Sequence, residues 1–581
     1  MELEGIMKRK NNILWLMCFV LLMPGCSYLT QPPAEDQEYQ DAIAGSTTDI
    51  VNSIPYSEKL VEDRKVYEQD DDSSVVHMYL TVMEQEEGQT FYDLNHFYDM
   101  QEDLTLSPHP LKAIIQEGDE NGPSPEMFQG DQELANSTVE LRGNTTRLAR
   151  QKSFQIKLEE QAGLWKGQTI LNLNKHPFDY TRVRNKLSFD YFEEIPNFTS
   201  MRTQFVKLHV KDLSEGENSG FVDYGLYTHI EQPNKRFLFS HGLDPNGNLY
   251  KANFFEFFRY PDQIKLADDP EYDKAKFEEV LQIRTGEDHT NLIEMLDSVN
   301  DYSQNINDVI DTHYDRDNYL TWMAINILMG NTDTTTQNFF LYNPINSKKF
   351  YFLPWDYDDA WKLEANNEGT DIGDVTKWNR GISNFWGSVL HQRFLKDPDN
   401  VEAVEDKLSE VLNIITPERT QELIDQYYPI VNEAVRQNPD LSGLPIRVET
   451  FDDLYQDLVY APDEKSSLFY ENLGNPMPVY MADPEKIENH MLFSWGASYD
   501  LQGDDLTYSI EISKTIDFAE TYYSKKNLED TQIEIPLKDL RKGENFWRII
   551  ITDEEGNTQE AFDRIYLNDI FYNGLKEFFV D

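Results

Sequence analysis

One stretch, residues 319–361, constrains the fold of this chain more than any other. It opens with apolar residues spaced i, i+3, i+4, i+7 and i+8, which predict a helix with one apolar stripe. These residues are Leu320, Met323, Ala324, Ile327 and Leu328. Asp315 or Asp317 can cap the start of this helix, and Gly330 stands where it should end. The chain must then leave the helix at a defined point.

The polar segment after that helix leads into a predicted β-hairpin. Two aromatic runs, residues 339–342 and 350–353, are joined through the turn-forming sequence Asn-Pro-Ile-Asn. A hairpin here would carry the acidic loop that contains Asp356 back towards Asp333 and Asn338. The sequence therefore predicts two carboxylates and one amide at the same end of the hairpin.

The order of these three side chains is that of the catalytic and metal-binding loops of protein kinases, where an Asp precedes an Asn by five residues and a hairpin leads to another Asp. Phosphoryl transfer needs a carboxylate to orient the substrate hydroxyl, and amide and carboxylate oxygens to hold Mg²⁺. Asp333 is the candidate catalytic base, and Asn338 and Asp356 are the candidate metal ligands. Capping and turn formation is the alternative for these residues, but the helix and hairpin around them favour the kinase layout.

Further segments extend the likeness to roughly residues 75–440. They are Leu-Arg-Gly-Asn at 141–144, Lys-Ser-Phe-Gln-Ile-Lys at 152–157, and residues 225–231. In this order they resemble the spore coat protein H (CotH) kinases, an atypical kinase-like family. The resemblance implies ATP and Mg²⁺ (or Mn²⁺) as cofactors, and transfer to Ser or Thr of a protein substrate, such as a spore coat or envelope protein.

The resemblance also implies residues that hold the phosphates. Arg142 would cover them, because the sequence has no glycine-rich loop of the G-x-G-x-x-G type. Lys157 alternates with apolar neighbours, so its side chain should point away from the core, where it can reach a phosphate. Lys152 is the other candidate for this role. A surface lysine is the alternative for either.

The base of the nucleotide is expected near His229 or Glu231, although a structural Glu is an equal reading. The family usually has a Trp six residues before the metal-binding Asp, where it stacks on adenine. Phe350 stands at that place here, so the resemblance predicts stacking on a phenyl ring.

The first residues predict an export signal. Lys8, Arg9 and Lys10 precede eleven apolar residues, and Met-Pro-Gly-Cys26 resembles a bacterial lipobox. We expect residues 1–25 to be removed, Cys26 to be lipidated, and the protein to be an extracytoplasmic, membrane-anchored lipoprotein that meets the membrane only through its lipid. Plain secretion is the second reading. An uncleaved membrane helix would need about 20 apolar residues.

Composition excludes several classes of function. With 51 basic and 105 acidic residues the net charge is −54, which argues against nucleic acid as a partner. The two cysteines, Cys18 and Cys26, lie within or at the end of the signal, so an internal disulfide and a Cys-x-x-Cys zinc site are excluded. Such an acidic protein needs local cations to hold a nucleotide.

We expect an α+β fold, with an atypical bilobal protein-kinase-like domain followed by an all-β sandwich. Residues 26–70 read as an acidic, polar tether and residues 71–470 as the CotH kinase-like domain, in which 270–313 and 401–437 predict amphipathic helices. Short alternating strands in residues 475–570 resemble a fibronectin type III sandwich. Trp495, Tyr508 and Trp547 are expected in its core.

Two other functions compete with the kinase. A surface adhesin or scaffold could keep a kinase-like fold without catalysis, and an exported protein meets little ATP. A glycoside hydrolase of the envelope also uses paired acids, but it has no need of an Asn five residues after an Asp.

Overall fold

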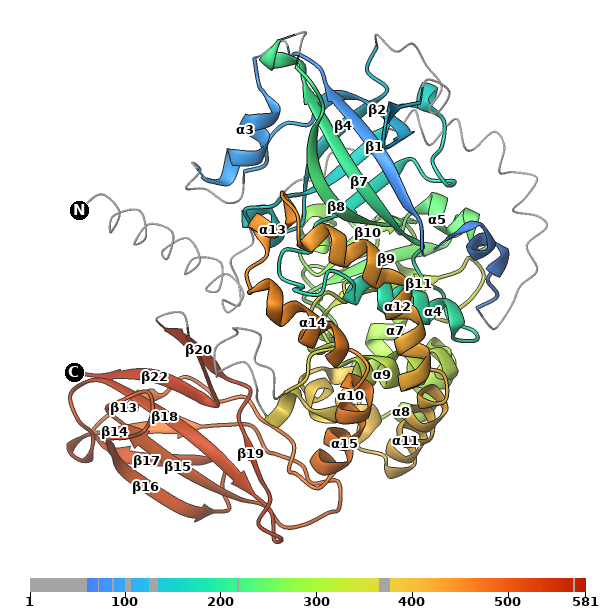
Figure 1. The fold of residues 1–581 in the computed structure, drawn as a ribbon. Helices are drawn as coiled ribbons and strands as arrows, with labels where there is room; N and C mark the ends of the chain where they lie inside the picture. The colour runs from blue at the N-terminus through green and yellow to red at the C-terminus, as the bar shows by residue number, and fades with distance from the viewer. Residues whose placement is uncertain are drawn as a thin grey trace, which may run out of the picture.

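The computed structural model describes residues 60–71, 73–85, 88–99, 106–124, 134–216, 219–364, 377–567 and 570–581. These residues form an α+β protein with a β-rich C-terminal part, as expected (Figure 1). The predicted signal segment, Cys26 and most of the tether lie outside the described residues. Among those described, we find no helix with the length and apolar character needed to cross a membrane.

The N-terminal sheet closes on itself as a barrel. Its strand order is β1-β7-β8-β6-β5-β4-β2, and β1 pairs with β2 as well as with β7. The strands are β1 (Val75–Val82), β2 (Leu111–Asp119), β4 (Ser137–Arg142), β5 (Ser153–Leu158), β6 (Ile170–Asn174), β7 (Thr203–Asp212) and β8 (Val222–Ile230), and the short β3 (Gly122–Pro123) extends β2. Alternate apolar residues of these strands fill the interior.

Strand β5 shows this alternation. Phe154 and Ile156 are fully buried, while Gln155 and Lys157 lie on the other face, as predicted. Ser153 belongs to the same face by alternation, but it is buried. Its hydroxyl accepts a hydrogen bond of 3.0 Å from the backbone N–H of Lys175, so a polar side chain is satisfied there.

The second part of the chain surrounds helix α9 (Arg316–Met329). Asp315 is the cap, since its carboxylate accepts the N–H of Asn318 at 2.9 Å, and Gly330 ends the helix with φ +64°. The predicted single stripe is wrong, because every residue from Asn318 to Met329 is buried. The hairpin and helices α11 and α15 cover its different sides (Figure 1).

A four-stranded sheet in the order β10-β9-β11-β12 packs beside α9. The predicted hairpin is confirmed as β11 (Gln337–Asn343) and β12 (Tyr351–Pro354), with Phe340 opposite Leu353. Strands β9 (Asn248–Asn253) and β10 (Leu281–Thr285) complete the sheet. Helix was expected across residues 270–313, but β10 interrupts it because its residues pair with β9.

The remaining helices pack around this sheet and around the base of the barrel (Figure 1). They are α4 (Arg184–Glu194), α5 (Lys235–Ser240), α6 (Lys274–Glu278), α7 (Thr290–Asn300), α8 (Ile306–His313), α10 (Val389–Leu395), α11 (Pro398–Leu412), α12 (Pro417–Val435), α13 (Asp440–Gly443), α14 (Val448–Asp457) and α15 (Ala461–Leu473); α3 (Phe91–His96) lies beside the barrel.

The C-terminal part consists of two main sheets around one core, with Trp495, Tyr508 and Trp547 buried in it as predicted. One sheet has the order β13-β14-β17 and the other β16-β15-β18-β19, with β22 also paired to β18. The strands are β13 (Glu485–Ile487), β14 (His490–Ser494), β15 (Thr507–Ser513), β16 (Thr521–Leu528), β17 (Gln532–Pro536), β18 (Gly543–Thr552), β19 (Thr558–Glu560) and β22 (Leu575–Val580); β20 (Arg564–Leu567) and β21 (Ile570–Asn573) form a separate ribbon.

Candidate active site

The end of α9 places the first two predicted site residues together. After Gly330 the chain makes a short 3₁₀ turn, Thr332–Thr334, which carries Asp333. Asn338 begins the hairpin with φ +57°, a conformation that Asn tolerates better than most residues. Its amide Nδ2 donates to the Asp333 carboxylate at 2.9 Å, and Gln337 donates to the other oxygen. The carboxylate is thus oriented by two amide side chains.

The far strand of the hairpin delivers Asp356 to the same end. Asp356 follows β12 with φ +59°, and its carbonyl oxygen accepts a 3.4 Å hydrogen bond from the side chain of Asn331. The next residue, Tyr357, is held by a 2.7 Å bond from its N–H to Asn185 on α4 and by a 2.8 Å bond from its hydroxyl to Asn326 on α9. Two helices therefore hold the acidic loop in place.

The acids at this end alter one another's ionisation. The pKa of Asp333 is raised to about 7, and the largest cause is the protein around the carboxyl, which displaces part of its water. The residue as a whole remains exposed to solvent. The hydrogen bond from Gln337 opposes the rise, and the negative charges of Asp359 and Asp356 add to it. The pKa of Asp358 is also raised, by burial first and then by the same two acids. A cation here would relieve this repulsion.

Three basic side chains gather near Trp355, the residue two positions before Tyr357. The Arg142 guanidinium and the Lys251 ammonium lie 5.5 Å and 5.6 Å from the centre of the Trp355 ring. Burial is the largest cause that lowers these pKa values, and the charge of Arg284 lowers them as well. The charge of Asp356 opposes the fall, and the resulting pKa is about 10 for Arg142 and about 8 for Lys251. Asp356 thus interacts both with the acids and with a half-buried basic cluster of Arg142, Lys251 and Arg284.

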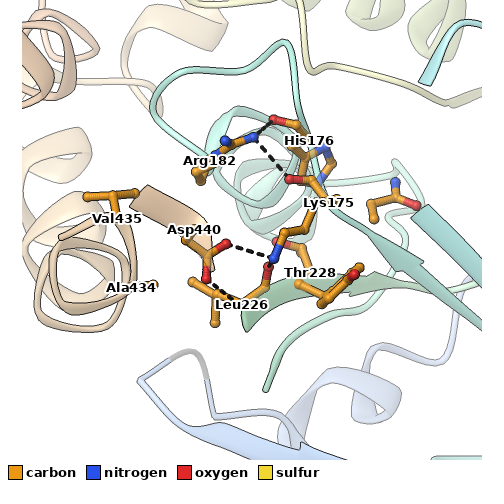
Figure 2. Close-up of a pocket in the computed structure, with 10 residues that line it drawn as sticks. Lys175, His176, Arg182, Leu226, Thr228, Ala434, Val435 and Asp440 are labelled. Carbon is orange, nitrogen blue, oxygen red and sulfur yellow. Dashed lines mark hydrogen bonds and ion pairs between the residues drawn. The ribbon is translucent and has the colours of Figure 1, made fainter. Parts of the chain in front are cut away.

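A small pocket beside this cluster marks the junction of the barrel with α12 and α13 (Figure 2). The Lys175 ammonium lies 2.7 Å from the Asp440 carboxylate and donates to the carbonyls of Tyr224 and Leu226. The neighbouring His176 is buried, and burial lowers its pKa to about 4 against the pull of Asp179 and Asp356. Arg182 donates to the carbonyl of His176 and, across the pocket, to that of Gly443 on α13. These contacts and the Lys175–Asp440 pair join the two parts of the fold.

Comparison with known proteins identifies the family. The model of the CotH kinase protein family matches residues 139–460, more than half of the chain. The chain belongs to the CotH kinase family. It is also similar to the inner spore coat protein H of Bacillus subtilis (strain 168), with 25% identity over 271 residues, which cover 46% of this chain and 70% of that protein. The resemblance read from the sequence is confirmed, and the C-terminal sandwich lies outside the matched residues.

Within the CotH kinase domain, the structure separates the predicted phosphate-binding residues. Arg142 is brought to Asp356, and it also donates a hydrogen bond to Asn174. Lys157 instead lies 3.4 Å from Glu140 on the neighbouring strand β4, at the barrel surface. Lys152 is buried, with its ammonium on the carbonyl of Arg147 at 2.8 Å. Lys157 is thus at the opposite end of β5 from Ser153, the residue that pairs with Arg142.

The residues expected near the nucleotide base are all buried. The Glu231 carboxylate lies 2.8 Å from the His241 ring nitrogen and accepts a hydrogen bond from Gln168. These contacts fit the alternative given above, in which Glu231 has a structural role. His229 packs edge-on against Trp165, with ring centres 4.7 Å apart. Phe350 is 1% exposed and lies at the opposite end of β12 from Asp356. Its ring presents no open face for a base here.

Lys251 and Arg284 were missed because their strands were not predicted. Lys251 lies on β9 opposite Phe340 of the hairpin, and Arg284 lies on β10, within residues expected to be helical. The sequence Asn-Leu-Tyr-Lys-Ala-Asn at 248–253 offered a signal, since it is a short aliphatic and aromatic run that carries a single charge. Its pairing with the hairpin has no local signature.

Proposed function

We propose that this member of the CotH family is a protein kinase that transfers the γ-phosphate of ATP to Ser or Thr. The observation that carries the proposal is the convergence at one end of the hairpin of Asp333, Asn338 and Asp356 with the basic cluster. In this proposal the barrel and the helical part act as the two lobes of an atypical kinase, and the site lies where they meet.

The donors at the site fit a hard divalent cation. Asn338 and Asp356 offer an amide oxygen and a carboxylate, which are ligands that Mg²⁺ and Mn²⁺ prefer. The Asn338 nitrogen donates to Asp333, so its oxygen is the end left for a metal. When bound, the ion would neutralise phosphate charge. The repulsion that raises the pKa values of Asp333 and Asp358 would be relieved at the same time.

The basic cluster supplies the charge that a nucleotide needs in a chain of net charge −54. The charge of Arg284 lowers the pKa values of both Arg142 and Lys251, and the charge of Asp356 opposes the fall in each. Phosphate oxygens are strong acceptors for both side-chain types. We assign to this cluster the role that the sequence suggested for Lys152 or Lys157.

Asp333 is suited to act as the base. A group with a pKa near the working pH can be ionised and still take a proton effectively, and the pKa of Asp333 is raised to about 7. The hydrogen bonds from Asn338 and Gln337 hold the carboxylate in one orientation, towards which the hydroxyl of a Ser or Thr would approach.

The setting of the kinase is proposed from the sequence and from the relative. The similar protein is named for the inner spore coat, so we propose a coat or envelope protein as substrate, and an extracytoplasmic chain anchored through a lipid on Cys26. The C-terminal sandwich would be a fibronectin type III-like spacer. A non-catalytic adhesin or scaffold remains the rival function.

Two substitutions separate the roles of the acids. Asp356→Ala should abolish metal-dependent binding of a non-hydrolysable ATP analogue, because the carboxylate that holds the metal is lost. Asp333→Ala should bind the analogue almost as the wild type does while its single-turnover rate falls roughly 100-fold or more. Calorimetric titration and transfer of radiolabelled phosphate measure both quantities.

Asp262→Ala is the matched control, since Asp262 lies exposed on a surface turn of the same domain, and both quantities should match the wild type. Equal loss of nucleotide affinity in the two site variants would contradict the assigned roles. Neither nucleotide binding nor label transfer by the wild-type chain would favour the adhesin.

A further inference from the structure

Three aspartates meet at one end of the C-terminal sandwich, outside the residues matched by the kinase family. Asp500 and Asp504 lie on the loop between β14 and β15, and Asp553 lies on the turn between β18 and β19. One carboxylate oxygen of each lies within 4.8 Å of the others. Asp500 is 5% exposed and Asp553 7% exposed. Buried carboxylates so close together repel one another unless a cation or donor neutralises them.

Turn formation accounts for only part of this cluster. One oxygen of Asp500 accepts the backbone N–H groups of Gln502 and Asp504, at 2.8 Å and 3.1 Å. Asp553 accepts the backbone N–H of Asn557 on one carboxylate oxygen and its side-chain amide on the other. The second oxygen of Asp500, Oδ2, is buried and has no hydrogen-bond partner among the described residues. A buried carboxylate oxygen without a partner is costly and calls for a ligand.

We propose that Asp500, Asp504 and Asp553 bind Ca²⁺. Calcium takes six to eight oxygen ligands at about 2.3–2.6 Å, so two ligands of one ion lie at most about 5 Å apart, which the 4.8 Å limit satisfies. Its irregular coordination suits ligands from two loops better than the strict octahedron of Mg²⁺. Backbone carbonyls and water would complete the shell. This site is separate from the proposed kinase function.

The ion would also fasten the sandwich to the CotH domain. Tyr499, next to Asp500, stacks on Trp386 with ring centres 5.5 Å apart, and its hydroxyl donates to the carbonyl of Lys396 at 3.3 Å. On the same loop, the Gln502 side chain donates to the carbonyl of Leu473 at the end of α15. A loop held by Ca²⁺ would keep Tyr499 and Gln502 in position for these contacts. Calcium should therefore stabilise both the sandwich and its junction with the kinase domain.

The test is calcium titration of the purified chain after treatment with EDTA, by calorimetry and by thermal unfolding. One site should bind Ca²⁺, and a free concentration of about 100 times Kd should raise the folding equilibrium constant of the sandwich about 100-fold. Asp500→Asn keeps the oxygen that closes its turn, and Asp553→Asn keeps the oxygen that accepts the backbone N–H of Asn557 while losing the acceptor of its side-chain amide. Both should weaken binding at least about tenfold. Asp504→Asn disturbs no turn bond that we observe among the described residues, and it should do the same.

Asp530→Asn is the control, because it removes one exposed charge from another turn of the sandwich; its calcium affinity should equal the wild type's. Asp356→Ala should also bind Ca²⁺ as before, which separates this site from the kinase site. No heat of binding and no thermal shift up to about 10 mM Ca²⁺, above the range of weak extracellular calcium modules, would overturn the proposal. Equal affinity in the wild type and the three cluster variants would overturn it too.

Discussion

Replacing Lys251 by Met should separate binding from stability. Lys251 lies on β9 opposite Phe340, and its ammonium is 5.6 Å from the centre of the Trp355 ring. Burial and the charges of Arg284 and Arg142 lower its pKa to about 8, and Asp356 only partly opposes them. Methionine keeps the length of the side chain and removes the charge. Such a cation is retained at a cost to the fold, which is typical of a functional group.

The cost can be worked from the pKa. A fall from 10.5 to about 8 corresponds to about 3 kcal/mol of folding free energy lost while the lysine is charged. Because the folded pKa is the lower one, this loss is complete below pH 8 and fades as the pH rises towards 10.5. Lys251→Met should therefore raise the free energy of unfolding by up to about 3 kcal/mol at pH 7, and by less above pH 8.

Nucleotide binding should change in the opposite direction. A hydrogen bond between charged groups contributes about 1.5–3 kcal/mol, so the affinity of Lys251→Met for a non-hydrolysable ATP analogue should fall roughly 10-fold to 100-fold. Urea unfolding at several pH values and calorimetric titration measure the two effects. Lys157→Met is the matched control: its surface pair with Glu140 contributes at most about 1 kcal/mol, and nucleotide affinity should not change. A destabilised Lys251→Met, or one that binds the analogue as the wild type does, would refute the reasoning.

Three further predictions rest on other ionisable groups. The kcat/KM of the kinase should rise with pH to a plateau. Its midpoint should lie at or below about 7, because the pKa of Asp333 is raised to about 7 without a metal and a bound cation would lower it; a rate that falls as the pH rises from 5.5 to 8.5 would argue against Asp333 as the base. Burial lowers the pKa of His241, but Glu231 and Glu62 outweigh it and raise the pKa to about 9. The stabilisation of the fold by protonated His241 is complete below about pH 6.5 and is lost as the pH rises through 9. His241→Gln should therefore flatten the pH dependence of the urea midpoint. Asp440→Asn leaves the Lys175 ammonium buried without its counter-ion and should lower the free energy of unfolding in urea by about 3–5 kcal/mol. A second change, Lys175→Met, should partly restore that stability. An unchanged urea midpoint in the single variant would contradict this.

Local sequence determined the features that depend on near neighbours. The cap at Asp315, the end at Gly330 and the two strands of the hairpin follow from residues a few positions apart, since a cap or turn closes hydrogen bonds within one turn of chain. The same locality brought Asp333 and Asn338 together. Alternation also predicted the face on which Lys157 lies.

Tertiary structure decided what those faces meet. Alternation directs Lys157 outwards, but only the pairing of β4 with β5 puts Glu140 beside it. Lys251 reaches Asp356 because β9 pairs with the hairpin across some ninety residues of chain, and helix α9 is buried all round because elements distant in sequence cover its other faces. Long-range pairing depends on the summed burial of whole elements and not on a local motif. The sequence therefore pointed to Arg142 but could not show that Lys251 and Arg284 join it, or that the three aspartates of the sandwich meet.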